Sequence, residues 1–353
     1  MTEYSVEQLL LEAKENKASD LHVTVGAPPK IRMHGKMVSL NLPEVTPEAA
    51  EYLVKEMLRE PYSQILMDNG EVDFSLDSDK VGRVRINILK QKGNYAFVGR
   101  LINDTPPLPA EIGLPESLVS LTKKKRGLVL VTGPTGSGKS TTLASLINEI
   151  NVNQRAHIIT LEDPIEYIHP HKLSIVNQRE IGMDTKSYTA ALRAALREDP
   201  DVILVGEMRD LDTIATAITA AETGHLVFST LHTIGAANTI DRVIDVFPPH
   251  QQQQIRIQLA AVLEAVISQQ LLPLQDGKGR VAAFETMHAN TAIRHLIREG
   301  KTHQIESIMQ TGRKQGMQTM DDAIFELYLK RKIDFDTALD YAVDPFILEK
   351  KLY

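Results

Sequence analysis

Apolar runs that alternate with amphipathic stretches dominate the chain from Gly127 to about Asp245. Four of these runs show almost no polar alternation, and they occupy residues 128–132, 157–161, 201–205 and 226–230. Such runs are typical of parallel strands that are buried on both faces. Between them, apolar residues recur at helical spacing, first at Leu143, Leu146, Ile147 and Ile150 and later at Leu211, Ile214, Ala215 and Ile218. The pattern predicts an α/β core around a parallel sheet, followed by a mostly helical region.

The first hundred residues follow a different pattern, in which short strand-like runs are interleaved with helical ones. Apolar residues at Val6, Leu9, Leu10 and Ala13 predict an opening amphipathic helix, and residues 47–60 predict a second helix. Strands are predicted at residues 21–25, 31–34, 72–76, 82–89 and 95–102. A sheet with helices on one side is the simplest packing for this order, so we expect a small α+β domain over residues 1–105.

A proline-rich stretch at residues 106–109 separates the two patterns. It is stiff and extended, because proline fixes φ and restricts the residue before it. We therefore place a linker over residues 106–120. The core domain is expected over residues 121–285 and a helical C-terminal region over residues 286–353.

Composition narrows the class of protein. Of the 353 residues, 42% are hydrophobic and 24% are charged, which is ordinary for a globular chain, and no apolar run approaches the roughly 20 residues that span a bilayer. The N-terminus shows no signal-peptide pattern, and the chain contains no cysteine, so we expect neither disulfides nor a thiolate metal site and place the protein in the cytoplasm. A net charge of −7 argues against a nucleic-acid partner.

One segment carries a specific chemical signal. Gly133-Pro-Thr-Gly-Ser-Gly-Lys-Ser140 matches the pattern G-x-x-x-x-G-K-[S/T] and lies between a predicted strand and a predicted helix. In such a loop the glycines let N–H groups point inward, and the helix N-terminus adds a favourable dipole for phosphate. Lys139 can reach the β- and γ-phosphates of ATP, and the Ser140 hydroxyl can ligate Mg²⁺. The predicted ATP site comprises Gly133, Pro134, Thr135, Gly136, Ser137, Gly138, Lys139, Ser140 and Thr141.

Hydrolysis also needs a carboxylate, and acidic residues follow two of the predicted strands. The strand at 201–205 is followed by Gly206 and Glu207, so glycine stands where phosphate-loop ATPases usually place aspartate. The strand at 157–161 is followed by Glu162, Asp163 and, slightly later, Glu166. Ligands bind at the carboxyl ends of parallel strands, so both acidic clusters are expected to face the loop. We predict functional roles for Asp163, Glu166 and Glu207, and a structural role for Glu162.

Two histidines, His225 and His232, flank the strand at 226–230. His232 follows the carboxyl end of that strand, where it can sense a γ-phosphate. Both histidines are candidates for the site, while a structural hydrogen bond is the alternative for each. Since they bracket a strand and the chain has no cysteine, a zinc site is not expected.

Taken together, the boxes GPTGSGKS, TLEDPIEY, ILVGEMRD and TGHLVFSTLHT resemble the secretion-ATPase superfamily that drives type II secretion and type IV pili. The resemblance covers nearly the whole chain, including the segment ASDLH near the N-terminus. AIRHLIRE at residues 292–299 is similar to the AIRNLIRE signature of the pilus-retraction branch, with His295 in place of asparagine. Relatives that extend pili usually carry a four-cysteine zinc module, which this chain lacks, so retraction is favoured over assembly.

The resemblance implies an N-terminal PAS-like domain, a RecA-like ATPase core, and ATP with Mg²⁺ as cofactors. It implies that Glu207 is the catalytic glutamate and Glu166 the essential acid of the acidic box. It also implies a homo-hexamer in which Arg83, Arg85 and Arg100 act as arginine fingers on a neighbour. The partners implied are an inner-membrane pilus platform protein, which would hold the motor at the inner face of the cytoplasmic membrane, and a paralogous pilus ATPase.

Three other classes of function were considered: a related pilus or secretion ATPase, a small-molecule kinase and a nucleic-acid translocase. An accessory retraction paralogue or a pilus-assembly or secretion ATPase would share most of these motifs. A small-molecule kinase would need an acceptor pocket and a lid, and would hydrolyse ATP slowly without an acceptor. A nucleic-acid translocase would need a basic, aromatic pore loop, which a chain with 5% aromatic residues and no tryptophan does little to supply. An ATP-driven ring motor fits the motifs best.

Overall fold

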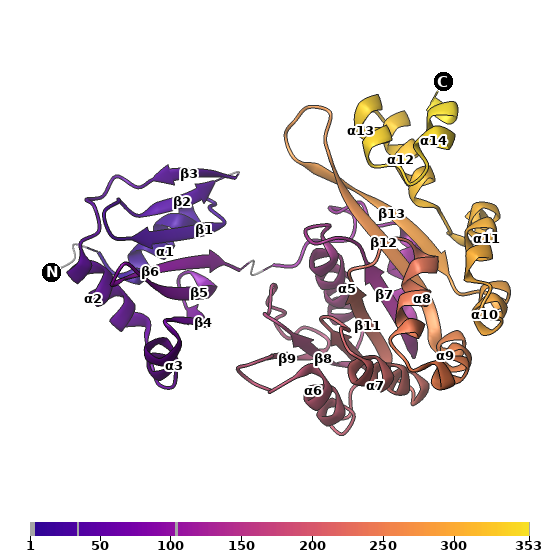
Figure 1. Cartoon of the computed structure of the whole chain (residues 1–353), viewed down its shortest axis with the longest axis horizontal. Coiled ribbons are helices and arrows are strands. Elements are labelled where there is room, and N and C mark those ends of the chain that lie inside the picture. Colours follow the sequence, from indigo (N-terminus) through magenta and orange to yellow (C-terminus); the bar gives the residue numbers. More distant parts are fainter. Residues whose placement is uncertain (1–3, 34, 103–104, 353) are drawn as a thin grey trace. The chain divides into compact units, whose positions relative to one another are not determined.

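The computed structural model describes residues 4–33, 35–102 and 105–352, which divide into two compact units (Figure 1). The first unit comprises residues 1–105 together with 166–168, and the second comprises 106–165 together with 169–353. Each unit has its own hydrophobic core and is described by itself.

The first unit is an antiparallel sheet with three helices. The strands lie in the order β3-β2-β1-β6-β5-β4, and consecutive pairs are antiparallel throughout. The strand bounds are β1 (Asp20–Thr24), β2 (Lys30–Met33), β3 (Lys36–Ser39), β4 (Glu71–Ser78), β5 (Gly82–Gln91) and β6 (Asn94–Leu101), and the helices are α1 (Val6–Glu15), α2 (Pro47–Met57) and α3 (Tyr62–Asn69). Five of these strands and the first two helices were predicted from the sequence; β3 and α3 were not. The part of the 31–34 prediction that falls on His34 lies outside the described residues.

Alternation of side chains gives the first sheet one buried face. On β5, Val84, Ile86 and Ile88 are buried in the core, together with Leu9 and Leu10 of α1. The arginines and polar residues between them point away from that core. Helix α1 begins at a capping box in which Ser5 and Gln8 exchange hydrogen bonds, which fixes where the helix starts.

The second unit is built on a seven-stranded sheet in the order β13-β12-β7-β11-β10-β8-β9. Every neighbouring pair is parallel except β12 with β13. The strand bounds are β7 (Gly127–Thr132), β8 (His157–Glu162), β9 (Ile175–Glu180), β10 (Val202–Val205), β11 (Leu226–Leu231), β12 (Leu263–Pro273) and β13 (Arg280–His288). The four core strands predicted from the sequence are confirmed.

Helices cover both faces of this sheet. Along β7, Val129 and Val131 pack on the face covered by α5 (Lys139–Asn153), while Leu128 and Leu130 pack on the opposite face. The opposite face is covered by α6 (Tyr188–Ala195), α7 (Leu211–Glu222), α8 (Ala236–Asp245), α9 (Pro249–Val262), α10 (Thr291–Arg298) and α11 (Ile305–Thr311). Burial on both faces explains why these strands read as continuous apolar runs.

The region after Asp245 is mostly helical, as expected, except that residues 263–288 form the long hairpin β12–β13 (Figure 1). Helix α9 runs directly into β12, with Val262 its last residue and Leu263 the first of the strand, so no turn residue marks the change. Strand β12 lies between β7 and β13, and an apolar run of that kind reads equally well as buried helix or buried strand. Strand β13 crosses residues 285 and 286, where the core domain was expected to end.

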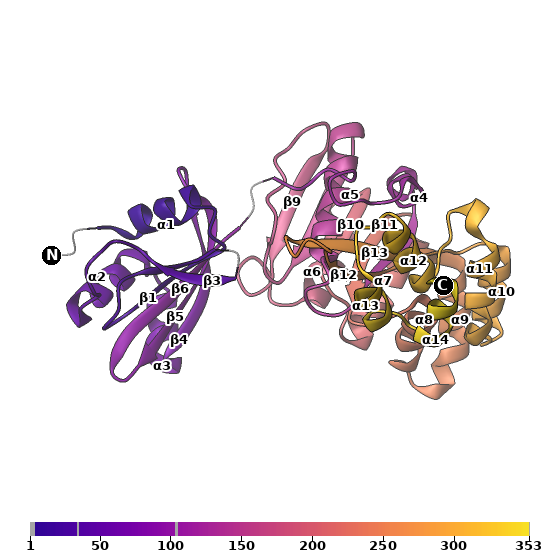
Figure 2. The same cartoon turned by 90° about the horizontal axis from the view of Figure 1, so that it is seen from above.

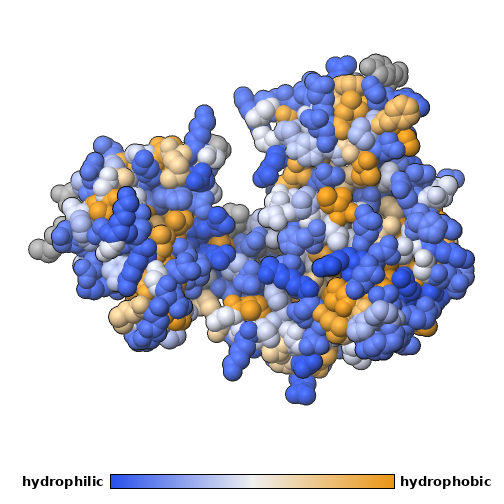
Figure 3. All heavy atoms as spheres, in the orientation of Figure 1, coloured by the Kyte–Doolittle hydropathy of each residue, from blue (hydrophilic) through white to orange (hydrophobic). Residues whose placement is uncertain are grey.

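The C-terminal helices form a small layer of their own. Helix α12 (Met320–Leu329) packs against β13, and α13 (Phe335–Asp340) and α14 (Pro345–Leu352) pack against α12 (Figure 2). The remaining short elements are α4 (Glu116–Val119) and the 3₁₀ turns η1 (Ser120–Lys123), η2 (Thr302–Gln304) and η3 (Arg313–Gln315). Figure 3 shows a mostly hydrophilic face with apolar groups scattered over it. Across the described residues, every helix is too short or too polar to cross a bilayer.

Candidate active site

The phosphate loop joins β7 to α5 at the carboxyl edge of the second sheet. Lys139, the first residue of α5, is only 9% exposed, and its ammonium donates hydrogen bonds to the carbonyl oxygens of Gly133 (2.8 Å) and Pro134 (3.0 Å). Its Nζ therefore lies over the inside of the loop. Thr135 and Gly136 are exposed at the tip, while Ser140 and Thr141 are half-buried in the first helical turn.

Strand β12 supports this loop from beneath, through Gln269. A side chain at Gly133, whose φ is 142°, would stand 2.3 Å from the Gln269 carbonyl oxygen, and one at Gly138 would stand 2.8 Å from Gln269 Nε2. The Gln269 amide oxygen also accepts a 2.7 Å hydrogen bond from the Thr142 hydroxyl. Both glycines are thus needed for close approach, and Gln269 is a contributor that the sequence did not reveal.

The acid and the histidine that follow neighbouring strands meet at the same edge of the sheet. Glu207, just after β10, places Oε1 at 3.1 Å from Nε2 of His232, just after β11. Its other oxygen lies 2.7 Å from Nη2 of Arg209. Burial favours a raised pKa for Glu207, but the Arg209 hydrogen bond and the charges of His232 and Arg209 outweigh it, so the pKa of this carboxyl falls below its usual value. Glu207 is therefore a carboxylate at neutral pH.

The glycine before Glu207 has a packing reason. A Cβ at Gly206 would lie 2.8 Å from the Tyr188 hydroxyl and 3.1 Å from the Leu161 carbonyl oxygen, so no aspartate fits there without displacing both. The Gly206 carbonyl oxygen accepts a 2.6 Å hydrogen bond from Thr230 on β11, and the Gly206 N–H donates to Leu161. These contacts hold the backbone that carries Glu207.

Asp163 belongs to the same edge. It follows the last residue of β8, the strand paired with β10. Burial raises the pKa of Tyr188, and the charges of Asp163, Glu207 and Glu162 add to the effect. Asp163 is exposed, whereas Glu162 accepts hydrogen bonds from Thr160 (2.6 Å) and Gln178 (3.1 Å) within the fold. The structural role of Glu162 stays a prediction, and these two contacts are consistent with it.

One predicted site residue in the second unit, His225, is placed apart from this cluster. His225 precedes β11, at the opposite end of the strand from His232, and its Nδ1 lies 2.9 Å from the Ala220 carbonyl oxygen. This contact is of the kind expected if His225 has a structural role and not a role in the site. Glu166 is exposed and falls in the segment 166–168 that is grouped with the first unit.

In the first unit, the three candidate arginines lie on β5 and β6, each beside an aspartate. Arg100 pairs with Arg85 across the sheet and with Asp20 on its other side. Arg100 Nε lies 2.9 Å from Asp20, and Arg85 Nε lies 3.5 Å from Asp73. Both arginines line a pocket of about 270 Å³. Arg83 Nη1 lies 3.2 Å from Asp77.

The donor set suits a magnesium ion carried in with a nucleotide. No group of three or more histidine, aspartate or glutamate side chains within residues 4–33, 35–102 and 105–352 is arranged to hold a metal by itself. The Ser140 hydroxyl, at the N-terminus of α5, supplies one oxygen beside the phosphate loop. Mg²⁺ is commonly held by a few protein oxygens together with phosphates, so the residues present fit this ion.

Comparison with known proteins agrees with this geometry. The family described as type II/IV secretion system protein matches residues 1–337. A twitching motility protein of Neisseria gonorrhoeae is 49% identical over 324 residues, covering 92% of this chain and 87% of its own. The type IV pilus retraction ATPase PilT of Pseudomonas aeruginosa is 46% identical over 340 residues, covering 96% of this chain and 98% of its own.

A solved structure shows the same likeness in three dimensions. A crystal structure of the pilus retraction motor PilT with bound ADP superposes with a TM-score of 0.93 at 50% identity, covering 99% of this chain and 100% of that one. Identity at this level over almost the full length of both chains establishes the family as well as the fold. The chain belongs to the type II/IV secretion system protein family, and within that family it is a PilT-like ATPase.

Proposed function

We propose that this protein is a motor that hydrolyses ATP to drive the retraction of a type IV pilus. The observation that carries the proposal is the edge of the second sheet, where a phosphate loop bearing Lys139 accompanies the Glu207–His232 pair. The near full-length similarity to a pilus retraction ATPase supplies the biological setting.

The residues at this edge have distinct tasks in hydrolysis. Lys139 moves from the loop carbonyls onto the β- and γ-phosphates, where its charge offsets the negative charge of the transferring group. Glu207, held ionised, accepts a hydrogen bond from the attacking water and orients it. His232 contacts Glu207 and lies after β11, so it senses the γ-phosphoryl group through the same carboxylate. Asp163 adds a second carboxylate to this edge.

Magnesium has one candidate ligand among these residues, the Ser140 hydroxyl in the first turn of α5. The ion supplies neutralising charge to the phosphates when it is bound with ATP. Gly133, Pro134, Thr135, Gly136, Ser137, Gly138 and Thr141 complete the cradle through backbone N–H groups and the first helical turn.

The proposal extends to assembly. The working form is a homo-hexamer in the cytoplasm, in which Arg83, Arg85 and Arg100 of one subunit complete the nucleotide site of its neighbour. Glu166 contributes the acid that the family resemblance assigns to it. The force is received by an inner-membrane pilus platform protein, with a paralogous pilus ATPase as a further partner. The exposed side of Arg100, 64% accessible in the single chain, makes it available for such a contact.

The proposal is tested by an ATPase assay on the purified protein and by the phenotype of a deletion strain. The purified chain should hydrolyse ATP in water without any acceptor. A deletion strain should carry many pili and no surface movement, and complementation with Glu207→Gln should leave it in that state. A deletion strain with few pili would indicate an assembly motor instead, and one that retracts normally would contradict the proposal.

A further inference from the structure

Glu285 contacts the N-termini of two helices, α8 and α12, and has no part in the proposed hydrolysis mechanism. It lies on β13, and its partly buried carboxylate accepts a hydrogen bond from each of two helix N-termini. Oε1 receives the N–H of Ala236, the first residue of α8, at 2.6 Å. Oε2 receives the N–H of Met320, the first residue of α12, at 3.3 Å. One side chain therefore joins two helices that are far apart in the sequence.

The first of these helices, α8, follows closely after His232 in the sequence. Only residues 233–235 separate His232 from α8. The N–H of Gly235 donates a 3.0 Å hydrogen bond to Ser268, which is the β12 residue paired with Glu285. The neighbouring residue on β12, Gln269, supports the phosphate loop on the opposite face. The β12–β13 hairpin thus holds the histidine loop and the phosphate loop at adjacent positions.

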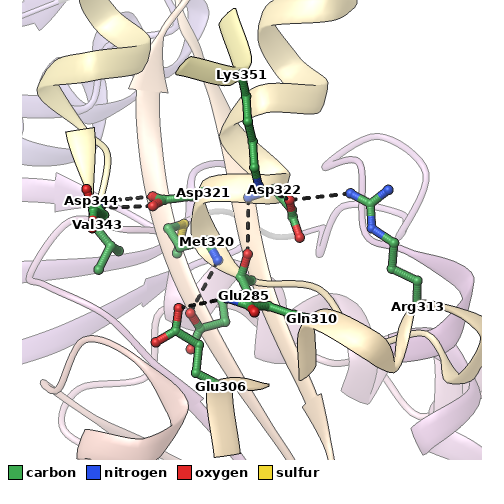
Figure 4. Close-up of polar contacts among 11 residues, drawn as sticks. Glu285, Glu306, Gln310, Arg313, Met320, Asp321, Asp322, Val343, Asp344 and Lys351 are labelled. Carbon is green, nitrogen blue, oxygen red and sulfur yellow. Dashed lines mark hydrogen bonds and ion pairs between the residues drawn. The ribbon is translucent and has the colours of Figure 1, made fainter. Parts of the chain in front are cut away.

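The second helix leads to the C-terminal layer. Segment 318 is tied to β13 by a two-way backbone bridge between Thr286 and Gln318, one residue from Glu285. Beyond it, Asp322 of α12 contacts Lys351 of α14 at 3.0 Å and Arg313 at 3.6 Å. Figure 4 shows Glu285 below Met320, with Lys351 and Arg313 converging on Asp322. The backbone of α12 is therefore held at one end by Glu285 and through its side chains by α14.

Several effects act on the ionisation of Glu285. Burial raises its pKa, the N–H groups of Ala236 and Met320 oppose that change, and the nearby carboxylates of Glu306 and Asp321 reinforce it, so that the pKa ends above its usual value. The positive ends of two helix dipoles favour negative charge at this point. The buried carboxyl group loses contact with water, and the two backbone N–H groups replace that contact. Its position therefore holds both helices.

We propose that Glu285 is a positioning residue, which fixes the loop carrying His232 and couples that loop to the C-terminal helical layer through α12. This inference rests on the proposed ATPase function and deepens it. A shift of α12 is transmitted through one carboxylate to the backbone that aims His232 at Glu207. A displacement of about 1 Å in such a support costs as much as 10²-fold in rate.

The test compares Glu285→Gln with Glu299→Gln, a matched control on an exposed carboxylate that does not act on Glu285. Glutamine has one acceptor oxygen where glutamate has two, so one of the two N–H groups loses its partner. We expect kcat for ATP to fall between about 10- and 100-fold in Glu285→Gln while KM changes little. Hydrogen exchange should speed up in the peptides that contain Ala236 and Met320. Glu299→Gln should leave all three quantities unchanged.

A second variant tests the coupling itself. Asp322→Asn weakens the attachment of α12 to α14 without touching Glu285, and it should lower kcat in the wild-type background. In a Glu285→Gln background the same change should have a smaller effect, since the link is already weakened. Assembly by light scattering and the thermal midpoint are recorded for every variant.

The outcomes separate the alternatives. A lower thermal midpoint in Glu285→Gln with unchanged kcat and KM would show that the residue only stabilises the fold and would overturn the proposal. An unchanged kcat in Asp322→Asn, or full additivity of the two changes, would overturn the coupling to the C-terminal layer. If the wild-type chain does not hydrolyse ATP, the proposed function fails, while hydrogen exchange still reports whether Glu285 holds both helices.

Discussion

Glu207 Oε1 lies 3.1 Å from His232 Nε2, so residues that follow two neighbouring strands of the sheet meet in direct contact. The acid is also paired with Arg209 at 2.7 Å. Two positive or polar partners on one carboxylate keep it ionised and hold it in one orientation.

Lys139→Ala should reduce ATP turnover by at least about 10² fold and weaken nucleotide binding, because the phosphate charge then has no ammonium beside it. The measurement is steady-state phosphate release together with fluorescent-nucleotide binding. Lys125→Ala is the matched control, since this exposed lysine precedes β7 at the opposite end of the strand from the loop. Wild-type turnover in Lys139→Ala would show that the phosphate loop is not the reaction site.

Gln269→Ala should destabilise the loop from beneath. The substitution leaves the Thr142 hydroxyl without its 2.7 Å acceptor in a buried position, at a cost of about 1–3 kcal/mol in the free energy of unfolding. Denaturant titration measures the change, and nucleotide affinity should fall with it. The neighbouring Gln270→Ala, on the other side of the strand, should have little effect on either; equal effects from the two variants would argue against a specific support by Gln269.

Arg209→Ala should move the pH dependence of turnover. The hydrogen bond and charge of Arg209 help to lower the pKa of Glu207, so their removal raises that pKa toward its usual value. The ionised form is then lost at a higher pH, and the acid-side fall in kcat should shift upward. Profiles of kcat against pH for the wild type, Arg209→Ala and the exposed Arg193→Ala measure this, with circular dichroism confirming the fold at each pH. A downward shift, or none, would contradict the assigned role of the pair.

The sequence was sufficient to predict this edge because its residues lie just after strands. The apolar runs before Lys139, Glu207 and His232 are visible locally, and parallel strands bring their carboxyl ends together. Gln269 could not be predicted in the same way, because it meets Thr142 across 127 positions of sequence. Its strand was itself read as helical, since α9 passes into β12 without a turn residue. Glu285, on the second strand of that hairpin, was missed for the same reason.

The arginines of the first unit provide a test of the ring. If Arg100 acts on a neighbouring subunit, an Arg100→Ala chain mixed with a Lys139→Ala chain should recover activity, because some interfaces then combine an intact loop with an intact arginine. Arginine fingers contribute about 10³ to 10⁵ in rate, so partial recovery is measurable. Arg85→Ala and Arg83→Ala are tested in the same way.

Arg32→Ala is the matched control for this mixing experiment, since Arg32 lies 3.9 Å from the same Asp20 that pairs with Arg100 but is not a candidate finger. It should retain activity on its own. Each variant must form rings by light scattering before mixing. If both inactive chains assemble and exchange subunits yet show no recovery at any ratio, the arginines do not act between subunits.

The most direct test of the account is Glu207→Gln, measured for ATP affinity and phosphate release in the same preparation. Glutamine keeps the shape of the side chain but not the charge that orients water, so turnover should fall by roughly 10²-fold or more while ATP still binds. Asp212→Asn, on the first turn of α7, is the control for removal of a carboxylate from the same region of the chain. Retention of wild-type phosphate release by Glu207→Gln would contradict the central claim that this carboxylate activates water for hydrolysis.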